Sequence, residues 1–273
     1  MRARLARLTL VTLAALAAGS TALPSSALGN SFDVTCARVR VANDDPLVFP
    51  GAPGVAHRHE FFGSRGVGAS TTTAQLRAAT TSCAVGDDTA AYWVPTLEVR
   101  GHLLRGTMRA YYQRAGKASA AAPPQGLRMI AGDPHGTGVQ PATVTTWQCV
   151  GRGRMRQFRT VPACTVGERL GAWVKFPDCW DGRRLDSPDH RAHVAYAVRG
   201  QCPSTHPVAM MRVAFLVTWP VRPASATAVT LADGMLDSHA MHGDFWNAWS
   251  PTRLAQLRWD CIEVAAPCGS LTR

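Results

Sequence analysis

The chain has 273 residues, of which 46% are hydrophobic and 17% are charged, and its formal net charge at pH 7 is +11. This length is enough for one large domain or two small ones, and the composition excludes wholesale disorder. The positive charge favours acidic partners such as anionic polysaccharide, cell wall or nucleic acid. A solvated cationic surface is the simpler explanation, because no nucleic-acid motif accompanies the charge.

The first 30 residues have the pattern of a secretory signal peptide. Three arginines precede an apolar run over residues 8–18, which is too short to span a bilayer as a helix. Small residues follow, with candidate cleavage positions after Ala22 and Ala27. No later apolar run has the length of a membrane span. We therefore expect a secreted, extracellular protein whose net charge falls from +11 to +8 when the three arginines are removed.

All eight cysteines lie after this segment, at positions 36, 83, 149, 164, 179, 202, 261 and 268. An even number of cysteines in an exported chain predicts up to four disulfides. Proximity along the chain favours the pairs Cys149–Cys164 and Cys179–Cys202. The sequence contains no Cys-x-x-Cys pair, which argues against a zinc ribbon or a thioredoxin-type redox site.

The predicted elements begin with a strand. Residues 31–41 are mostly β-forming, and a loop with two aspartates and three prolines follows over residues 43–54. Residues 71–79 are expected to contain a short helix, with Thr72 or Thr73 as its N-cap. Glycine and proline separate these elements from the next apolar runs, so the elements are short.

The strand predicted over residues 92–100 is interrupted by Pro95, which favours an edge or a bulge. Residues 208–219 form the longest apolar run after the signal segment and predict a long buried strand, with a helix as the alternative. Residues 251–259 have helical spacing, with proline in the first turn. Many short strands between turns predict a mainly β, disulfide-stabilised fold: a single β-sandwich or jelly-roll-like domain over residues 31–273, with a few short helices.

Two histidine motifs are candidates for metal binding. His57 and His59 are two residues apart, so on a strand both imidazoles face the same way and can converge on one ion. His242 and Asp244 share a face in the same manner, and a carboxylate beside a histidine can fix its tautomer. The alternative is that both motifs are ordinary polar residues of the core or surface. Zinc and copper are the ions that this hypothesis implies.

The segment over residues 176–196 concentrates titratable groups between prolines and glycine, which is typical of a loop. Its Asp178 and Asp181 could be the paired carboxylates of a glycosidase, and Asp189 with His190 could be an acid/base unit. The alternative is that several aspartates accept hydrogen bonds from their own turns. A further histidine, His206, lies between prolines on a rigid loop, where a catalytic or ligand side chain is well held.

Several motifs in this order resemble the family of domains of unknown function numbered nineteen ninety-six, which are secreted proteins of fungi and actinobacteria. They are His57-x-His59 before Phe61-Phe62-Gly63, Tyr92-Trp-Val-Pro95, Gly126-Leu-Arg-Met-Ile130, Phe176-Pro-Asp-Cys-Trp-Asp-Gly182, Leu185-Asp-Ser-Pro-Asp-His190, Cys202-Pro-x-x-His-Pro207 and His242-x-Asp-Phe245. The resemblance covers nearly all of the chain after the signal segment. One departure is Asn247-Ala-Trp249, where members commonly have Asn-Gly-Trp.

The resemblance implies a secreted protein but no particular activity. Fungal members are often fused to wall- or carbohydrate-binding modules, which favours an extracellular polysaccharide or cell-wall component as partner. The leading hypothesis is a polysaccharide hydrolase or lyase; its catalytic residues would be Asp181, Asp189, His190, His206 and Asp244, and its sugar-stacking residues Trp180 and Trp246. The second hypothesis is a non-catalytic wall- or metal-binding protein with His57, His59 and His242 as ligands. The third is that all these residues only hold a disulfide-bonded shell together.

Overall fold

The computed structural model describes residues 30–272, except 115, 117–118, 152–155, 223–228, 233, 235–237 and 265–267. The predicted signal segment therefore lies outside the described residues, apart from its last position. The described chain contains 39% strand and 10% helix. This confirms the prediction of a mainly β fold with a few short helices.

The elements are as follows. The strands are β1 (Ser31–Ala42), β2 (His59–Gly63), β3 (Ala91–Pro95), β4 (Leu97–Val99), β5 (His102–Leu103), β6 (Thr107–Gln113), β7 (Arg128–Gly132), β8 (Thr145–Val150), β9 (Gln157–Phe158), β10 (Arg169–Lys175), β11 (Cys179–Trp180), β12 (Val194–Ala195), β13 (Val208–Ala209), β14 (Arg212–Trp219), β15 (Val229–Leu231), β16 (His242–Trp246) and β17 (Gly269–Leu271). The helices are α1 (Thr73–Ala78) and α2 (Pro251–Leu257), with a 3₁₀ turn η2 (Ser238–Ala240) and a π-helical segment η3 (Arg258–Glu263).

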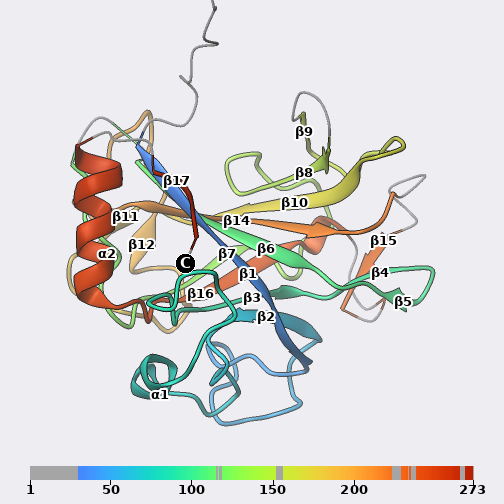
Figure 1. Ribbon diagram of the computed structural model, residues 1–273, viewed down its shortest axis with the longest axis horizontal. Helices are drawn as coiled ribbons and strands as arrows, with labels where there is room; N and C mark the ends of the chain where they lie inside the picture. The colour runs from blue at the N-terminus through green and yellow to red at the C-terminus, as the bar shows by residue number, and fades with distance from the viewer. Residues whose placement is uncertain are drawn as a thin grey trace, which may run out of the picture.

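One large sheet organises the molecule (Figure 1). Its strand order is β7-β16-β3-β2-β1-β6-β14-β10-β8-β9, and β17 adds to β1 in parallel. Strand β1 belongs to both halves, because residues 31–37 pair with β6 and residues 38–42 pair with β2. The register shifts between Arg38 and Arg40. Such a bulge bends a strand and increases its twist, which lets the sheet curl so that its two halves face each other.

The core lies between the two facing halves of this curled sheet. Tyr92 of β3 packs edge-to-face on Phe215 of β14, with 5.3 Å between ring centroids. Phe245 of β16 lies 6.1 Å from Phe176, which directly follows β10. All four of these aromatic side chains are fully buried. The two layers expected of a sandwich are thus formed by one continuous sheet, and residues that point away from this core form its outer face.

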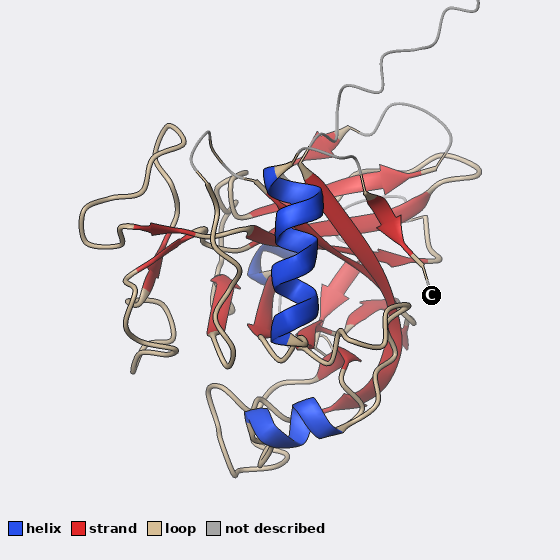
Figure 2. Ribbon diagram, turned by 60° about the vertical axis from the view of Figure 1, so that its left-hand side comes forward, coloured by secondary structure: helices blue, strands red, loops and turns tan. Residues whose placement is uncertain are grey.

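The two helices flank the sheet (Figure 2). The Thr72 hydroxyl accepts a hydrogen bond from the Gln75 amide and the Gln75 side chain accepts one from the Thr72 amide, so α1 has a capping box at the predicted position. Pro251 occupies the first turn of α2, also as predicted, and Leu254 and Leu257 face the core. No helix among the described residues has the length and apolarity needed to cross a membrane.

Two predicted strands are each divided between sheets. The run over residues 208–219 contains β13, an interruption at Met210 and Met211, and then β14. The backbone amides of these methionines bond to the carbonyl oxygens of Asp178 and Ala121, which lie outside both strands. Pro95 does not mark an edge strand, because β3 lies between β2 and β16; it is the residue at which the chain leaves the large sheet for β4.

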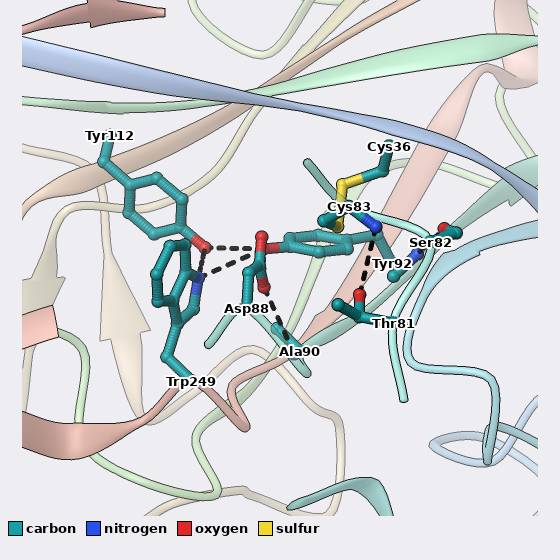
Figure 3. The surroundings of a disulfide bond; sticks show 10 residues. Cys36, Thr81, Ser82, Cys83, Asp88, Ala90, Tyr92, Tyr112 and Trp249 are labelled. Carbon is teal, nitrogen blue, oxygen red and sulfur yellow. Dashed lines mark hydrogen bonds between the residues drawn. A yellow bond between two sulfur atoms is a disulfide. The ribbon is translucent and has the colours of Figure 1, made fainter. Parts of the chain in front are cut away.

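Four disulfides close the fold. The predicted pairs Cys149–Cys164 and Cys179–Cys202 are both present. The other two disulfides are Cys36–Cys83 and Cys261–Cys268. The Cys36–Cys83 bridge links β1 to the segment that follows α1 and closes the longest loop, because its cysteines are 47 positions apart along the chain. It adjoins a buried polar chain (Figure 3).

That polar chain runs through the core. The Trp249 indole N–H donates to the Tyr112 hydroxyl at 2.8 Å, which lies 2.8 Å from the Tyr92 hydroxyl, and Tyr92 donates to the Asp88 carboxyl at 2.8 Å. Burial raises the pKa of Asp88 to about 8, although the Tyr92 hydroxyl and the Ala90 amide oppose the shift. The Asp88 side chain is therefore mostly protonated at neutral pH in the folded protein.

Replacing Asp88 by asparagine should change the pH dependence of stability. The native protein keeps the Asp88 proton up to about pH 8, whereas the unfolded chain loses it near the ordinary value of 3.8. The protonated Asp88 side chain therefore makes its full contribution to the free energy of unfolding below pH 3.8, and this contribution declines as pH rises toward 8. Relative to wild type, Asp88→Asn should gain roughly 1 kcal/mol of unfolding free energy per pH unit in this window. Urea unfolding at pH 5, 6 and 7 measures the difference in unfolding free energy between the two proteins. A difference that stays the same at all three pH values would contradict this expectation.

Candidate metal centre

Three histidines meet on the outer face of the large sheet. His59 begins β2 and His242 begins β16, and these strands flank β3 on either side. His57 precedes β2 and lies on the same side as His59, with 4.2 Å between the two ring centroids. His59 and His242 are buried, and His57 is partly exposed. The sequence predicted the His57–His59 pair and His242 as separate motifs, and the strand order brings them together.

Backbone carbonyl groups fix the tautomers of the two buried rings. The Nδ1 of His59 lies 2.9 Å from the Asp44 carbonyl oxygen, and the Nδ1 of His242 lies 2.8 Å from that of Ala240. A carbonyl oxygen can only accept a hydrogen bond, so each Nδ1 carries a proton. In a neutral imidazole the other nitrogen, Nε2, then has a free lone pair. Both Nε2 atoms point into the space between the rings.

The three rings are neutral over the ordinary pH range. Burial, and then the charge of His135, lowers the pKa of His57 to about 4. Burial, and then the neighbouring His57, lowers the pKa of His242 to about 3 and holds that of His59 well below its usual range. The Nε2 atoms of His59 and His242 are 3.4 Å apart, and those of His57 and His242 are 3.1 Å apart. Between His59 and His242 no proton is available for a hydrogen bond, so neither Nε2 can donate to the other. His57 Nε2 donates to His242 Nε2 in its Nε2-protonated tautomer, and in its Nδ1-protonated tautomer all three Nε2 atoms are unprotonated.

This spacing suits a metal ion. Zinc–imidazole bonds of about 2.0–2.1 Å in a tetrahedral site place two ligand nitrogens about 3.3 Å apart. The two measured separations, 3.1 and 3.4 Å, bracket that value. Unprotonated imidazole nitrogens are the ligands that zinc and copper accept in proteins. The carbonyl groups of Asp44 and Ala240 act as the outer partners that orient ligand histidines.

Two carboxyl groups adjoin the histidines. Asp244 lies two residues after His242 on β16 and is 1% exposed, and its Oδ2 has no hydrogen-bond partner among the described residues. Ligand atoms of Asp45, His59 and Asp244 lie within 4.8 Å of one another. Burial, and then the charge of Asp45, raises the pKa of Asp244 well above its usual range.

A second buried polar atom without a partner lies opposite Asp244. Trp93 of β3 faces Asp244 of β16 in register, and the Trp93 indole N–H has no acceptor among the described residues. Unsatisfied buried groups are rare in folded proteins and call for an explanation such as an ion or a water. Two of them on paired residues of neighbouring strands, on the face that carries the three imidazoles, mark this face as a candidate binding site.

The segment over residues 176–196 approaches the histidine cluster at Arg191. Arg191 donates to the Gly132 carbonyl oxygen of β7 at 2.6 Å, and its charge acts on both Asp244 and His242. The neighbouring His190 contacts Asp186 at 2.8 Å and lies close enough to Asp45 to act on it electrostatically. This segment therefore forms one wall of the candidate site, with a cation at the end nearest the histidines.

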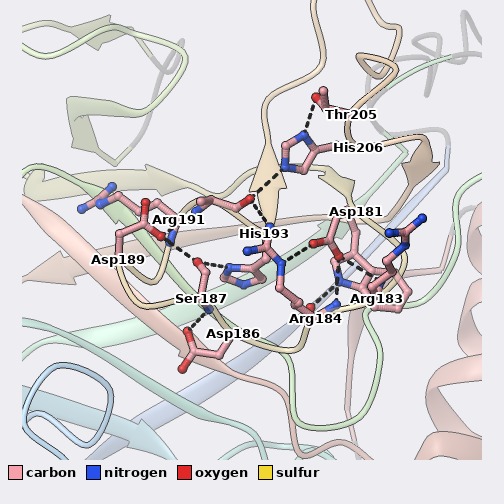
Figure 4. A network of polar contacts seen from close by, with 12 residues as sticks. Asp181, Arg183, Arg184, Asp186, Ser187, Asp189, Arg191, His193, Thr205 and His206 are labelled. Carbon is pink, nitrogen blue, oxygen red and sulfur yellow. Dashed lines mark hydrogen bonds and ion pairs between the residues drawn. The ribbon is translucent and has the colours of Figure 1, made fainter.

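The predicted catalytic aspartates of this segment accept hydrogen bonds from their own turns (Figure 4). Burial opposes ionisation of Asp181, but the Arg184 backbone and guanidinium and the Arg183 amide outweigh it and lower its pKa to about 2. The Ala192 amide, the Ser187 hydroxyl and the Arg191 amide lower the pKa of Asp189. Both carboxylates are ionised at neutral pH and accept hydrogen bonds from nearby backbone amides. This agrees with the alternative that the aspartates of this segment stabilise their own turns.

The remaining predicted site residues also have partners outside the histidine cluster. The two nitrogens of His206 face the Thr205 hydroxyl at 2.9 Å and the Ala192 carbonyl oxygen at 3.3 Å. The Trp180 indole donates to the Arg184 carbonyl oxygen at 2.6 Å. Trp246 is 1% exposed, and the guanidinium of Arg128 covers its ring at 4.0 Å from the centroid. None of these contacts places the three side chains at the histidine cluster.

Ser187, His193 and Asp189 lie together without forming a catalytic triad. The Ser187 hydroxyl contacts His193 Nδ1 at 2.9 Å and the Asp189 carboxylate at 2.7 Å, while His193 Nε2 donates to the Arg128 carbonyl oxygen at 2.7 Å. In a triad the carboxylate binds the imidazole and orients it toward the serine. Here the carboxylate binds the serine instead, and the Ser187 side chain is buried, so the trio stabilises its loop.

Three members of the site, Asp45, Arg191 and Trp93, were not predicted from the sequence. Asp45 lies in a predicted loop, and Arg191 lies in the central segment without a predicted role. Trp93 belongs to a predicted strand and to the motif Tyr92-Trp-Val-Pro95, with no predicted role at the site. The paired aspartates at positions 44 and 45 and the cation next to His190 were visible signals. Their contribution depends on the strand order, which brings residues 45, 93, 191 and 244 to one face, and no local pattern reports that order.

Comparison with known proteins identifies the family. The model of the family described as "Domain of unknown function (DUF1996)" matches residues 45–249, a span that contains the three histidines, Asp45, Asp244 and the whole central segment. Neither the curated proteins nor the solved structures contain a match to the chain. The domain expected over residues 31–273 is longer than this match and stays a prediction. Because the match covers most of the chain, the protein belongs to the DUF1996 family.

Proposed function

We propose that the protein binds one transition-metal ion, zinc or copper, through the Nε2 atoms of His57, His59 and His242. The observation that carries this proposal is the pair of unprotonated Nε2 atoms of His59 and His242, 3.4 Å apart and facing each other. Without a cation between them these lone pairs repel, and the fold holds them there through two carbonyl hydrogen bonds. An ion turns this unfavourable contact into two ligand bonds.

Three protein ligands leave one position of a tetrahedral ion for another group. Structural zinc sites have four protein ligands, whereas three imidazoles and an open position are typical of sites that bind water or substrate. An ion of this kind acts as a Lewis acid on the group in its open position. Asp244 and the Trp93 indole N–H, both buried and both with an unsatisfied atom, are placed to bind or orient such a group.

The polysaccharide hydrolase or lyase hypothesis has less support than metal binding. A proton donor needs a carboxyl group that stays protonated near the working pH, and hydrogen bonds lower the pKa of Asp181 and Asp189 instead. Among the predicted catalytic residues, Asp244 lies within ligand distance of His59 in the cluster, and burial raises its pKa. We also propose that the protein is exported, because four disulfides suit an oxidising compartment.

Metal titration of untagged, metal-free protein tests this function. We expect one equivalent of zinc or copper to bind, and at about a hundredfold excess of free ion over Kd to raise the free energy of unfolding by about 2.7 kcal/mol. Magnesium is the control ion, because it prefers oxygen ligands and should leave the melting temperature unchanged. Protein that binds neither zinc nor copper in stoichiometric amount, and melts at the same temperature with and without them, would refute the proposal.

A further inference from the structure

A cleft of about 890 Å³ lies on the outer face of the other half of the sheet. Its floor is a row of residues in register across four strands: Asp33 of β1, Tyr111 of β6, Ala214 of β14 and Lys175 of β10. Ala214 is 1% exposed and carries only a methyl group between larger neighbours. The hollow follows from this small residue on the central strand, and the cleft shares no lining residue with the histidine cluster.

Two aromatic rings, Tyr111 and Trp173, belong to the apolar part of the lining, and these residues are 8% and 9% exposed. The rings of Tyr111 and Trp173 are 4.9 Å apart between centroids, with a 43° angle between their planes. The Trp173 indole N–H already donates to the Gln148 side chain at 2.9 Å, so a ligand in the cleft would contact the ring and not the N–H. Aromatic faces of this kind suit ligands with flat apolar surfaces and polar edges, and the C–H faces of a sugar ring have that character.

The polar lining of the cleft is strongly cationic. Four cationic residues line it, Arg109, Lys175, Arg199 and Arg212, against the single carboxylate of Asp33. Asp33 is already bonded to Arg109 at 3.3 Å and to the Ser270 hydroxyl at 2.8 Å. Electrostatic complementarity therefore calls for an anionic ligand.

Lys175 is the cation best placed for that ligand. Its ammonium donates to the Ala142 carbonyl oxygen at 2.9 Å and to the Gln157 amide oxygen at 3.1 Å, and it has no carboxylate partner among the described residues. An ammonium has three donors, so two neutral acceptors hold it in place and one N–H is left for the ligand. Arg212 differs, because Asp178 pairs with it at 2.6 Å.

We propose that this cleft binds uronic-acid residues of an acidic extracellular polysaccharide. The sugar ring lies on Tyr111 and Trp173, its carboxylate faces Lys175, and side chains such as Gln113, Gln157 and Ser270 bond its hydroxyl groups. A neutral sugar would leave the Lys175 ammonium without an anionic partner, and an apolar ligand would leave the amide and hydroxyl groups unsatisfied. The inference does not depend on the metal proposal, since the cleft and the histidine cluster have no residue in common.

Calorimetric titration with trigalacturonate tests the cleft, with chelator present so that metal binding plays no part. We expect trigalacturonate to bind and the neutral trisaccharide maltotriose to bind at least about tenfold more weakly. Loss of one charge-assisted hydrogen bond weakens binding by about this factor. Lys175→Gln should weaken trigalacturonate binding by about tenfold for the same reason. Arg169→Gln is the matched control, because it removes one charge from an exposed residue of the same strand and the same face, outside the cleft.

Two further comparisons separate a built site from a merely basic surface. Trp173→Leu should also weaken trigalacturonate binding, because it removes the stacking ring and keeps the charge. Ala214→Leu should do the same by filling the floor, and circular dichroism checks that both variants are folded. The proposal is overturned if folded Trp173→Leu and Lys175→Gln bind like wild type, if maltotriose binds equally well, or if oligo-dT competes and Arg169→Gln weakens binding as much as Lys175→Gln.

Discussion

Replacing His57 by alanine is expected to weaken zinc binding by more than about 100-fold. Loss of an outer hydrogen-bond partner of a ligand already costs 10- to 100-fold in metal affinity, and loss of the ligand itself costs more. His57 is the most suitable of the three histidines for this experiment, because it is partly exposed and its removal leaves the buried pair in place. Competition with a chromophoric zinc chelator at pH 7 gives the affinity of each variant.

His102→Ala is the matched control for this prediction. His102 is an exposed histidine on β5, outside the cluster, so the same substitution there should leave zinc affinity unchanged. His242→Gln adds a second comparison, because it replaces a ligand nitrogen and keeps much of the buried volume. Equal zinc affinity in wild type, His57→Ala and His242→Gln would show that the ion binds elsewhere.

Removing the Cys36–Cys83 bridge should lower the free energy of unfolding by about 4 kcal/mol. In the chain-entropy model a disulfide stabilises by restricting the unfolded chain, and the 47-residue separation of these cysteines gives this value. The bridge also joins β1, which belongs to both halves of the sheet, to the segment that leads into Asp88 and the buried tyrosine chain. The double variant Cys36→Ser/Cys83→Ser removes it without leaving a free thiol.

The Cys261–Cys268 bridge provides the comparison for this effect. Its cysteines are only 7 residues apart, so the same model gives about 2 kcal/mol for Cys261→Ser/Cys268→Ser. Guanidinium unfolding of the two double variants should therefore rank the Cys36 variant as clearly less stable. An equal loss in both variants, or a greater loss on removing the short bridge, would show that loop length does not set the contribution of these bridges.

The sequence predicted those features of the fold that depend on nearby residues. Local chemistry predicted an N-cap at Thr72 or Thr73, the proline in the first turn of α2 and the bridges Cys149–Cys164 and Cys179–Cys202. The structure confirms each of them, with Thr72 as the cap. The division of the run over residues 208–219 was not predicted, because backbone bonds from distant segments end the first strand at Ala209. The curl of the sheet was not predicted either, since it depends on the register shift within β1.

The candidate site was predicted in its parts and not in its assembly. Spacing of two residues placed His57 with His59 and His242 with Asp244, but only the strand order brings the two motifs to one face. The central segment was expected to supply catalytic aspartates, and its turns bind Asp181 and Asp189 instead. The cationic cleft had no sequence signal, because it arises where Ala214 stands between Tyr111 and Lys175 on neighbouring strands.

X-ray absorption at the metal edge measures directly whether three imidazoles bind one ion. Zinc-loaded wild-type protein should show three imidazole ligands at about 2.0–2.1 Å, and His57→Ala protein, if it retains zinc, should show two. His102→Ala protein should give the wild-type spectrum. A zinc spectrum with at most one imidazole, or a spectrum unchanged by loss of His57 and by His242→Gln, would contradict the account.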